Sequence, residues 1–373
     1  MPDALMVSSS FLPGRGGIES FLAELCAALA PRLGVLAPGR RDGLPLPAGL
    51  PYPTRGYRGR LFVPGPRAAR ATIAAAAELG TDRVLYGTPW PQALTGPRIR
   101  SAGLRYAAIV HGAELLVPAA IPGVRRRLVR ALSEAELLLP VSLFTAARIR
   151  GLLEEAGAPI PPIAVLRARV DVERFRPGAG RDEARRRLHV APDAPVILCF
   201  GRMVARKGLD RLVGALPAIA ERVPDVVLVL AGAGPEEKAL RRAAARSRQR
   251  VVFAGRVPEE DAPGVYAAAD VFALPVADRW FGLDTEGLGL VLLEASACEV
   301  PCVTGRSGGT SEAVVDGVTG FVVDAREEWR LAMAIVRLLS DRGLARRMGK
   351  AGRRHVSEEF GGRIPAALMQ WLE

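Results

Sequence analysis

Two glutamates eight residues apart combine residue types and a spacing that suit the binding of a nucleotide. Glu286 stands in a loop with Gly287 and Gly289, and Glu294 stands in the apolar run that follows. A helix that begins near Gly289 would direct free N–H groups and its positive dipole end at an anion. Glu294 on the same wall would accept two hydrogen bonds from a vicinal diol. The alternative is an ordinary surface glutamate before a helix that holds a second, structurally paired glutamate.

Two cations in the middle of the chain form a second candidate site. Arg202 and Lys207 follow the apolar run Val196–Phe200, and Gly208 precedes a helix-like segment. Two permanent cations at the carboxyl end of a strand make a clamp for a diphosphate. Their charge would stabilise a nucleoside-diphosphate leaving group. The alternative is a pair of exposed surface cations without a ligand.

Three loops in the first half of the chain also follow predicted strands. Gly16 and Gly17 open a predicted helix, where glycines let phosphate or sugar oxygens approach the backbone. The loop is not G-x-G-x-x-G, so a dinucleotide site is not favoured. His111 and Ser142 each follow an apolar run, a place from which side chains reach ligands in parallel sheets. The competing interpretations are a plain turn for the glycines and a structural role for the histidine.

Short apolar runs alternate with longer helix-like segments along the whole chain, which predicts parallel sheets with helices on both faces. Ligands collect at the carboxyl ends of the strands in such sheets. The predicted strands of the first half are Ala4–Ser8, Leu33–Ala37, Arg83–Tyr86, Tyr106–Val110, Leu137–Val141 and Ile163–Leu166. Those of the second half are Val196–Phe200, Val226–Leu230, Val251–Ala254, Val271–Pro275 and Pro301–Thr304.

The length of the chain predicts two domains. It has 373 residues, more than one typical core holds, and its hydrophobic content of 49% excludes a disordered chain. A polar passage rich in Pro and Gly begins after Val170 and marks the best boundary. We therefore expect a first domain over residues 1–170, a linker over 171–185 and a second domain from residue 186.

The formal net charge of +12 favours anionic partners, although only three of the 51 basic residues are lysines, which is typical of a GC-rich codon bias. Arg125, Arg126, Arg127 and Arg130 share a predicted helix with apolar residues, a pattern that suits adsorption to anionic lipid. A solvated helix face is an equal alternative. Nucleic acid is not favoured as a partner, because no aromatic stacking platform accompanies the charge.

The cysteines and the N-terminus indicate a cytoplasmic protein without a metal site. All four cysteines lie in apolar segments, as expected for core packing in a reducing compartment. The three histidines are too scattered for a metal site. The first apolar run reads as a strand instead of a signal peptide, and no run reaches the roughly 20 apolar residues of a membrane helix.

Taken together, the motifs resemble those of retaining family-4 glycosyltransferases of the GT-B fold. The matching patterns are Gly-Arg-x4-Lys-Gly with Arg202 and Lys207, Glu-x7-Glu with Glu286 and Glu294, and a Gly-Gly-x-x-Glu loop that ends at Glu312. The resemblance spans nearly the whole chain and is strongest over residues 196–321. The chain departs from the family's Gly-Val-Asp segment before the second domain, where it has arginine in the place of glycine.

The resemblance implies a GT-B fold, in which two Rossmann-like doubly wound domains face each other across a cleft. Residues 1–170 would form the acceptor-side domain, and residues 186–355 would bind the nucleotide sugar. Residues 356–373 would cross back to the first domain. It also implies front-face transfer with retention, with the nucleotide sugar as substrate and with no metal or cofactor.

The resemblance also assigns roles to individual residues. Arg202 and Lys207 would hold the diphosphate, Glu294 the ribose and Glu286 the donor sugar, and His111 would lie near the reacting centre. Backbone groups would add to the donor site, and Ser142 would lie on the acceptor side. These backbone contacts are expected at Gly16, Gly17, Val257 (near the base), Leu288 and Gly289.

The run from Gly282 to Leu290 narrows the resemblance to GDP-mannose-dependent phosphatidyl-myo-inositol mannosyltransferases, because the chain has Leu288 where many relatives have Phe. It implies a hexosyltransferase that moves mannose from GDP-mannose to a glycolipid such as a phosphatidylinositol mannoside, on the cytoplasmic face of an anionic membrane. The alternatives are a UDP-sugar-dependent transferase, a nucleotide-sugar epimerase or dehydrogenase, and a non-catalytic protein that binds anionic surfaces.

Overall fold

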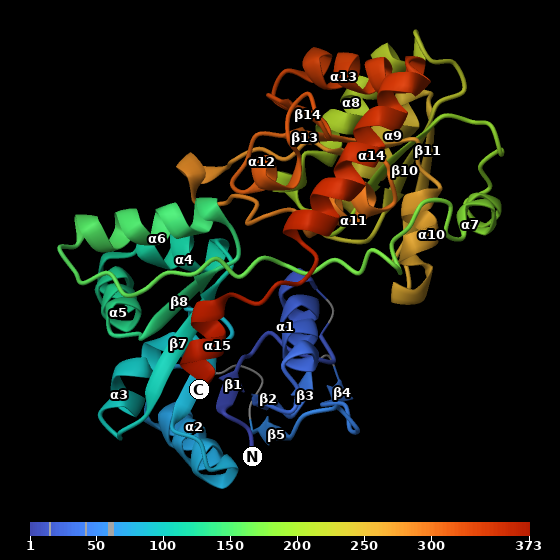
Figure 1. Cartoon of the computed structure of the whole chain (residues 1–373). Helices are drawn as coiled ribbons and strands as arrows, with labels where there is room; N and C mark the ends of the chain where they lie inside the picture. Colours follow the sequence, from blue (N-terminus) through green and yellow to red (C-terminus); the bar gives the residue numbers. More distant parts are fainter. Residues whose placement is uncertain (15, 42, 59–62) are drawn as a thin grey trace. The chain divides into compact units, whose positions relative to one another are not determined.

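The computed structural model describes residues 1–14, 16–41, 43–58 and 63–373, and the chain divides into two compact units. Unit 1 comprises Met1–Arg169 and Arg363–Glu373, and unit 2 comprises Val170–Gly362. Each unit is built on a six-stranded parallel sheet flanked by helices (Figure 1). The predicted α/β class with two doubly wound domains is therefore confirmed.

The sheet of unit 1 has the strand order β5-β2-β1-β6-β7-β8, and all its pairs are parallel. Its strands read as continuous apolar runs because helices bury them on both faces, except for the partly exposed edge strand β5. The strands are β1 (Ala4–Val7), β2 (Leu33–Pro38), β5 (Thr54–Tyr57), β6 (Arg83–Tyr86), β7 (Arg105–Val110) and β8 (Leu137–Pro140). A two-stranded ribbon adds β3 (Arg40–Arg41) and β4 (Leu44–Pro45).

The helices of unit 1 pack in a connected series, with α2 against α3, and α5 against α3, α4 and α6. Their apolar residues and those of the strands form one buried core cluster that includes Tyr86, Tyr106 and Leu128. The helices are α1 (Gly17–Ala28), α2 (Pro66–Leu79), α3 (Gly96–Arg100), α4 (Ala113–Ala119), α5 (Pro122–Ser133), α6 (Leu143–Glu155), α15 (Ala366–Leu372) and the 3-10 turn η1 (Gln92–Thr95).

The sheet of unit 2 has the strand order β11-β10-β9-β12-β13-β14, again parallel throughout. The carboxyl ends of β9, β12 and β13 therefore meet at one edge, and the loops that carry the candidate residues start there. The strands are β9 (Val196–Phe200), β10 (Val227–Ala231), β11 (Arg250–Gly255), β12 (Val271–Leu274), β13 (Cys302–Gly305) and β14 (Gly320–Val323).

In unit 2, helix α8 packs with α9 and α13, and helix α11 packs with α10 and α14. Helix α13 also packs against α14. Helix α7 packs against α10. The helices are α7 (Arg181–Arg187), α8 (Leu209–Ala220), α9 (Glu237–Ser247), α10 (Ala262–Ala267), α11 (Leu290–Ala297), α12 (Thr310–Ala313), α13 (Glu328–Ser340) and α14 (Arg342–Glu359). Three 3-10 turns are η2 (Ala205–Lys207), η3 (Glu259–Asp261) and η4 (Trp280–Gly282).

The expected linker over residues 171–185 is instead part of unit 2, and its last residues begin helix α7. The physical reason is Arg185, whose side chain is only 3% exposed. Its guanidinium donates to the backbone oxygens of Ala191, Pro192, Ala194 and Ala268 and to the carboxylate of Asp270, at 2.6 to 3.1 Å. These bonds fasten α7 to the loops around β9 and β12.

The return to unit 1 comes later than expected, because α14 continues to Glu359 and the units divide after Gly362. Helix α15 then packs on β8, and the indole N–H of Trp371 donates to Glu136 at 3.0 Å. The segment that follows α14 is therefore an integral part of unit 1.

The predicted strand Ile163–Leu166 is wrong, since this segment makes one isolated bridge between Ile163 and Leu138. Its backbone runs beside β8 and donates from Ala164 and Leu166, at 3.0 and 2.8 Å. Pro140 on β8 has no N–H to donate back to this segment, so the ladder stops after one bridge. Strand β5 was not predicted, because its short, exposed sequence lacks an apolar run.

Replacing Arg185 by Ala should lower the unfolding free energy of unit 2 by about 3–5 kcal/mol, because Asp270 and four backbone oxygens lose their common donor. Urea unfolding followed by circular dichroism measures the change. Arg186→Ala in the same helix is the matched control, because that side chain is 73% exposed and pairs only with its neighbour Glu183. An unchanged midpoint for Arg185→Ala would contradict the anchoring role.

Candidate active site

The loop after β9 carries the two predicted cations in different environments. Arg202 is exposed and makes no ion pair or hydrogen bond through its side chain within the described part of the chain. Lys207 is only 7% exposed, at the end of η2. Gly208 has a left-handed backbone with φ of +67° and starts α8, and a side chain there would collide with the Pro275 carbonyl oxygen. The loop thus presents one free and one buried cation.

Lys207 and Glu286 form the centre of a buried ion-pair cluster. Lys207 Nζ lies 3.0 Å from Glu286 Oε2, and the two side chains are 9% and 11% exposed. Arg206 lies between two carboxylates, with Nη2 3.3 Å from Glu286 Oε2 and Nε 3.7 Å from Asp284 Oδ1. No well-aligned hydrogen bond reaches Glu286 Oε2 within the described residues, so these contacts are mainly ionic. Arg206 was not among the predicted site residues, although it directly precedes Lys207.

The cluster keeps Glu286 ionised. Burial by itself would raise the pKa of this carboxyl group, but the charges of Lys207 and Arg206 outweigh burial and hold its pKa below the ordinary value. The carboxylate is therefore a hydrogen-bond acceptor at neutral pH.

The loop after β13 fixes the backbone of Glu286. Its N–H donates to the hydroxyl of Ser307 at 3.1 Å, and its carbonyl accepts from the N–H of Gly309 at 3.0 Å. Ser307 in turn donates to Asp278. A side chain at position 308 would overlap the Glu286 carbonyl oxygen at 1.8 Å, so the close approach of the two loops requires Gly308.

Helix α11 begins at Gly289, which has a left-handed backbone with φ of +88° and serves as the N-cap. Leu288 is 6% exposed, and its side chain belongs to the core. Glu294 lies on α11 and accepts a short hydrogen bond from the hydroxyl of Tyr266 on α10. The predicted helix start beside Glu286 and the position of Glu294 on that helix are both present.

Tyr266 is a site residue that the sequence analysis missed. It is fully buried, and its ring packs against Phe200 with a centroid distance of 5.0 Å and against Phe175 and Phe272 at 5.8 and 5.7 Å. Burial, together with the neighbouring charge of Glu294, raises its pKa far above the ordinary value, so the hydroxyl stays protonated and donates. Tyr266 therefore fixes the orientation of the Glu294 carboxylate.

Val257, the predicted base contact, lies on a hollow of about 530 Å³ between α7, α10 and the end of β11. Phe253, Val265 and Leu188 also line this hollow, with Arg256 and Asp261 among its charged residues. The cations and glutamates of the candidate site are not among the lining residues. The contact between Val257 and a base stays a prediction.

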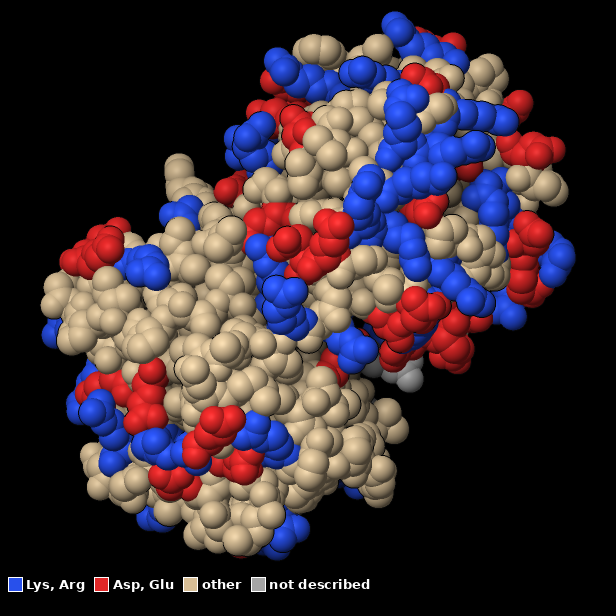
Figure 2. All heavy atoms as spheres, in the orientation of Figure 1, with Lys and Arg blue, Asp and Glu red and all other residues tan. Residues whose placement is uncertain are grey.

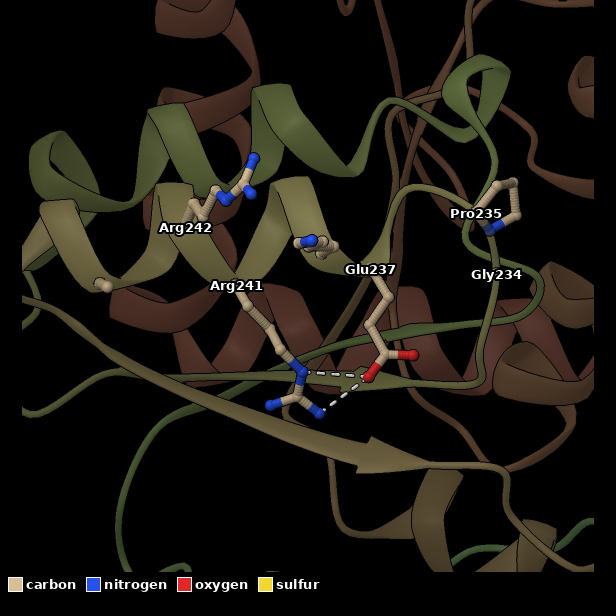
Figure 3. Close-up of a pocket in the computed structure, with 7 residues that line it drawn as sticks. Gly234, Pro235, Glu237, Arg241 and Arg242 are labelled. Carbon is tan, nitrogen blue, oxygen red and sulfur yellow. Dashed lines mark hydrogen bonds and ion pairs between the residues drawn. The ribbon is translucent and has the colours of Figure 1, made fainter.

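A second hollow, of about 600 Å³, lies beside α9 (Figure 3). Gly234 and Pro235 form one side of it, and Arg242 and Arg241 project from the helix. Arg241 is paired with Glu237 at 2.8 Å. Figure 2 shows Lys and Arg side chains gathered over α9 and α14 of unit 2, where a positive field attracts anions.

In unit 1, Gly16 and Gly17 lie at the start of α1. A side chain on Gly16 would lie 2.5 Å from Glu19 Oε2, whereas the space at Gly17 is open. Glu19 is held by an ion pair with Arg41 at 2.7 Å. Residue 15, directly before Gly16, lies outside the described residues. The role of these glycines toward a donor stays a prediction.

His111 follows β7, as predicted, and has a defined tautomer. Its Nε2 lies 3.0 Å from the carbonyl oxygen of Gly87, which can only accept, so Nε2 carries the proton. Phe21 packs edge-on against the ring with a centroid distance of 5.3 Å. Burial lowers the pKa of His111, against the opposing charge of Glu114. The ring is neutral at pH 7, and Nδ1 is left as an acceptor.

Ser142 lies at the start of helix α6, and its expected place on the acceptor side stays a prediction. Ser142 is fully buried, and its hydroxyl accepts from the N–H of Thr145 at 3.1 Å, so it caps helix α6. The sequence placed it correctly after a strand, but a strand end is also where the next helix needs an N-cap.

The four predicted surface arginines lie on α5 and fall into two pairs. Arg125 pairs with Glu155 and Arg130 with Glu134, at 2.8 and 2.7 Å. Arg126 and Arg127 are exposed and have no side-chain partner within the described residues. Only these two leave a positive charge uncompensated on the helix.

Comparison with known proteins identifies the family. The chain is 37% identical to the GDP-mannose-dependent alpha-(1-6)-phosphatidylinositol monomannoside mannosyltransferase of Mycolicibacterium smegmatis, over 99% of this chain and 97% of that protein. The chain belongs to the group 1 glycosyltransferases. The family model described as "Glycosyl transferases group 1" matches residues 180–355 of this glycosyltransferase. The predicted membership of the family-4 enzymes with the GT-B fold is confirmed, and so is the predicted hexosyltransferase activity.

A second relative and two solved structures agree. The glycosyltransferase is 35% identical to the GDP-mannose-dependent monoacylated alpha-(1-6)-phosphatidylinositol monomannoside mannosyltransferase of Corynebacterium glutamicum, over 95% of this chain and 93% of that protein. Its fold matches sucrose-phosphate synthase from Thermosynechococcus elongatus with a TM-score of 0.79, at 23% identity over 99% and 98% of the chains. It also matches the fold of WaaG, a glycosyltransferase involved in lipopolysaccharide biosynthesis, with a TM-score of 0.74, at 17% identity over 99% of both chains.

Two features are absent from the described residues. No helix among them is long and apolar enough to span a bilayer. No group of three or more His, Cys, Asp or Glu side chains in the same residues is arranged to hold a metal ion. All four cysteines are buried free thiols.

Lys207→Met should raise the pKa of Glu286 and destabilise unit 2 by about 2 kcal/mol at pH 7, because a buried carboxylate then keeps only Arg206. A carboxyl group with a lowered pKa contributes stability at neutral pH that is lost as the pH falls through the folded-state pKa. The variant should therefore lose less stability than the wild type on acidification, and the difference between the two should narrow as the pH falls toward 4. Urea unfolding between pH 4 and pH 8 measures this. Lys238→Met, at an exposed lysine on α9, is the control, and equal pH profiles for the two variants would refute the pairing.

His111→Gln should flatten the dependence of unit 1 stability on pH below about 6.5. With its pKa lowered in the folded state, His111 binds a proton more weakly there than in the unfolded chain, so the glycosyltransferase loses stability as the solution is acidified. Glutamine keeps a donor for the Gly87 carbonyl but does not titrate. Thermal unfolding between pH 5.5 and 7.5 tests this, with the exposed His189→Asn as control. Equal slopes for wild type and His111→Gln would contradict it.

Proposed function

We propose that this glycosyltransferase moves mannose from GDP-mannose to a phosphatidylinositol monomannoside, with retention of configuration at the anomeric carbon. The observation that carries the proposal is the identity of 37% over 99% of the chain to an enzyme named for this donor and this acceptor. A second enzyme named for the monoacylated acceptor is similar over 95% of the chain. The cation and carboxylate chemistry of unit 2 supports the same assignment.

Arg202 and Lys207 would bind the diphosphate of the donor. Arg202 supports this role because it is exposed and has all five of its donors free for phosphate oxygens. Lys207 would share its charge between the phosphate and Glu286, 3.0 Å away. The N-terminus of α11, with the backbone of Leu288 and Gly289, would add N–H donors and a positive dipole end.

The two glutamates would take the two sugars of the donor. Glu294 has one carboxylate oxygen bonded to Tyr266, and the carboxylate so held would accept hydrogen bonds from the ribose diol. Glu286 is ionised and rigidly held, which suits a hydrogen bond from a mannose hydroxyl. His111, through Nδ1, would accept from a donor-sugar hydroxyl.

The reaction itself would need no additional carboxylate pair of the hydrolase kind. The bond between the anomeric carbon and the phosphate oxygen breaks as the acceptor hydroxyl oxygen forms its bond on the same face. The proton of that hydroxyl passes to the leaving phosphate, so GDP departs with the electron pair of the broken bond. Arg202 and Lys207 would stabilise the developing negative charge, and we propose that no metal is required.

The lipid acceptor calls for contact with a membrane surface, and unit 1 offers a suitable region. Val117 on α4 is 40% exposed, and Ile121, which directly precedes α5, is 52% exposed. Helix α5 carries Arg126 and Arg127. Exposed apolar side chains beside unpaired arginines suit anionic lipid. Residence on the cytoplasmic face of the membrane stays a prediction, as does the absence of nucleic-acid partners.

A product assay tests the proposed donor and acceptor. The full chain is incubated with GDP-mannose, UDP-glucose or UDP-N-acetylglucosamine and with phosphatidylinositol monomannoside, and the lipid products are separated and weighed by mass spectrometry. We expect the lipid acceptor to gain a single hexose when GDP-mannose is the donor and none when either UDP-sugar is the donor. A product formed with a UDP-sugar instead would overturn the assignment, and free mannose without a lipid product would also count against it.

Arg202→Ala should lower kcat with GDP-mannose by at least about 100-fold, because the leaving diphosphate loses a preorganised cation. The exposed Arg242→Ala on α9 is the control for a lost surface charge and should keep normal turnover. Activity of Arg202→Ala within a few-fold of the control would show that Arg202 does not hold the diphosphate.

A further inference from the structure

Two adjacent aromatic side chains project into solvent from the loop between β12 and α11. Trp280 is 60% exposed, and Phe281 is completely exposed, the largest exposed fraction of any hydrophobic side chain among the described residues. Single exposed apolar residues are ordinary on protein surfaces, but two neighbouring large aromatic side chains at a loop tip are a substantial apolar surface in contact with water. Most of this surface is left uncovered by the described residues of unit 2.

The loop that carries these side chains has a firmly held base. Arg279 and Asp284 pair across it, with backbone hydrogen bonds of 3.1 and 3.2 Å in both directions. Asp278, at the root of the loop, accepts from Ser307 and, through its backbone oxygen, from Arg326 at 3.2 Å. The aromatic tip is therefore displayed on a rigid support.

The backbone at the tip is strained. Trp280 and Phe281 both have positive φ, +49° and +56°, in the left-handed region that bulky residues rarely adopt. Residues persist in this region only where the surrounding structure imposes it, and such strain collects at functional positions. Here the paired base of the loop imposes a tight turn, and both rings are left exposed to water.

Cations surround the root of the loop. Arg279 has its guanidinium 5.3 Å from the centre of the Trp280 ring and is 39% exposed. Arg306 and Arg326 are also exposed, and Arg306 has no side-chain partner in the described part of the chain. The nearby carboxylates are already engaged, Asp278 by Ser307 and Asp284 by Arg206 and Arg279. The surface is thus aromatic at its tip and positive at its root.

We propose that the loop formed by residues 278–284, here called the aromatic loop, inserts Trp280 and Phe281 into the interface of an anionic lipid bilayer. Tryptophan rings favour the interface between headgroups and acyl chains, and arginines at its edge bind anionic headgroups. The aromatic loop ends two residues before Glu286, so insertion would hold the sugar-binding carboxylate beside the lipid surface. This inference rests on the proposed function, since the lipid surface is the one that carries the acceptor.

The first test measures binding to vesicles without any substrate. The full chain is sedimented with vesicles of phosphatidylcholine and phosphatidylglycerol. We expect the double variant Trp280→Ser with Phe281→Ser to lower the partition coefficient by at least about tenfold. Val318→Ser is the matched control, because Val318 is 55% exposed in the same unit but precedes β14, at the amino end of the sheet. Wild-type partition of the double variant would overturn the proposal.

The charge of the loop root is tested separately. Arg306→Gln should weaken binding to the anionic vesicles by roughly fivefold and leave binding to pure phosphatidylcholine unchanged. Raising the salt concentration should remove the difference, because screening acts on exposed charges. An equal effect on both vesicle types would refute the role of charge in docking.

The second test separates docking from direct contact with the acceptor. Mannosyl transfer is measured with phosphatidylinositol monomannoside in vesicles and with its water-soluble deacylated headgroup. Loss of turnover by the double variant on vesicles alone supports insertion into lipid. Equal losses on both acceptors would instead mean that the rings stack on the acceptor sugar, and the proposal would be wrong. If the wild type glycosylates neither acceptor, the proposed function fails, while vesicle binding still decides the role of the aromatic loop.

Discussion

The contact between Lys207 and Glu286 is the constraint on which the candidate site depends. Both groups are almost fully buried, and a buried charge without a partner costs several kcal/mol. The loop after β9 and the loop before α11 must therefore meet in one register, or the unit carries two uncompensated charges. The parallel order of β9, β12 and β13 makes that meeting possible, because their carboxyl ends lie at the same edge. The need to pair these two buried charges therefore fixes the positions of the two loops.

A similar arrangement recurs at two other places in unit 2. Tyr266 is enclosed by aromatic rings, and its hydroxyl reaches one acceptor, Glu294. Arg185 is enclosed by backbone carbonyls and ends on Asp270. Each of these two side chains bonds one carboxylate, which fixes its orientation. Tyr266 in this way fixes the candidate site residue Glu294, and Arg185 fixes helix α7.

The sequence predicted what depends on local pattern and spacing. The alternation of apolar runs located nearly every central strand, and the motifs singled out Lys207 and Glu286, which the structure brings into contact. Contacts between distant segments were not accessible in this way. Tyr266 meets Glu294 across 28 residues, and Arg206 meets Glu286 across 80, distances over which no periodicity carries information. The capping role of Ser142 was not predicted, because a helix cap and a ligand contact call for the same residue type at the same strand end.

The position of helix α15 has a consequence for how the chain acquires its structure. Unit 2 is inserted between two parts of unit 1, and Leu368 and Leu372 from the later part are buried in the core of unit 1. Domains usually fold as they leave the ribosome, in the order of synthesis. Here residues 1–169 lack their last packing element until unit 2 has been made. The unit that begins first is therefore completed last, and the nascent chain must keep an unfinished apolar surface out of aggregates while unit 2 folds.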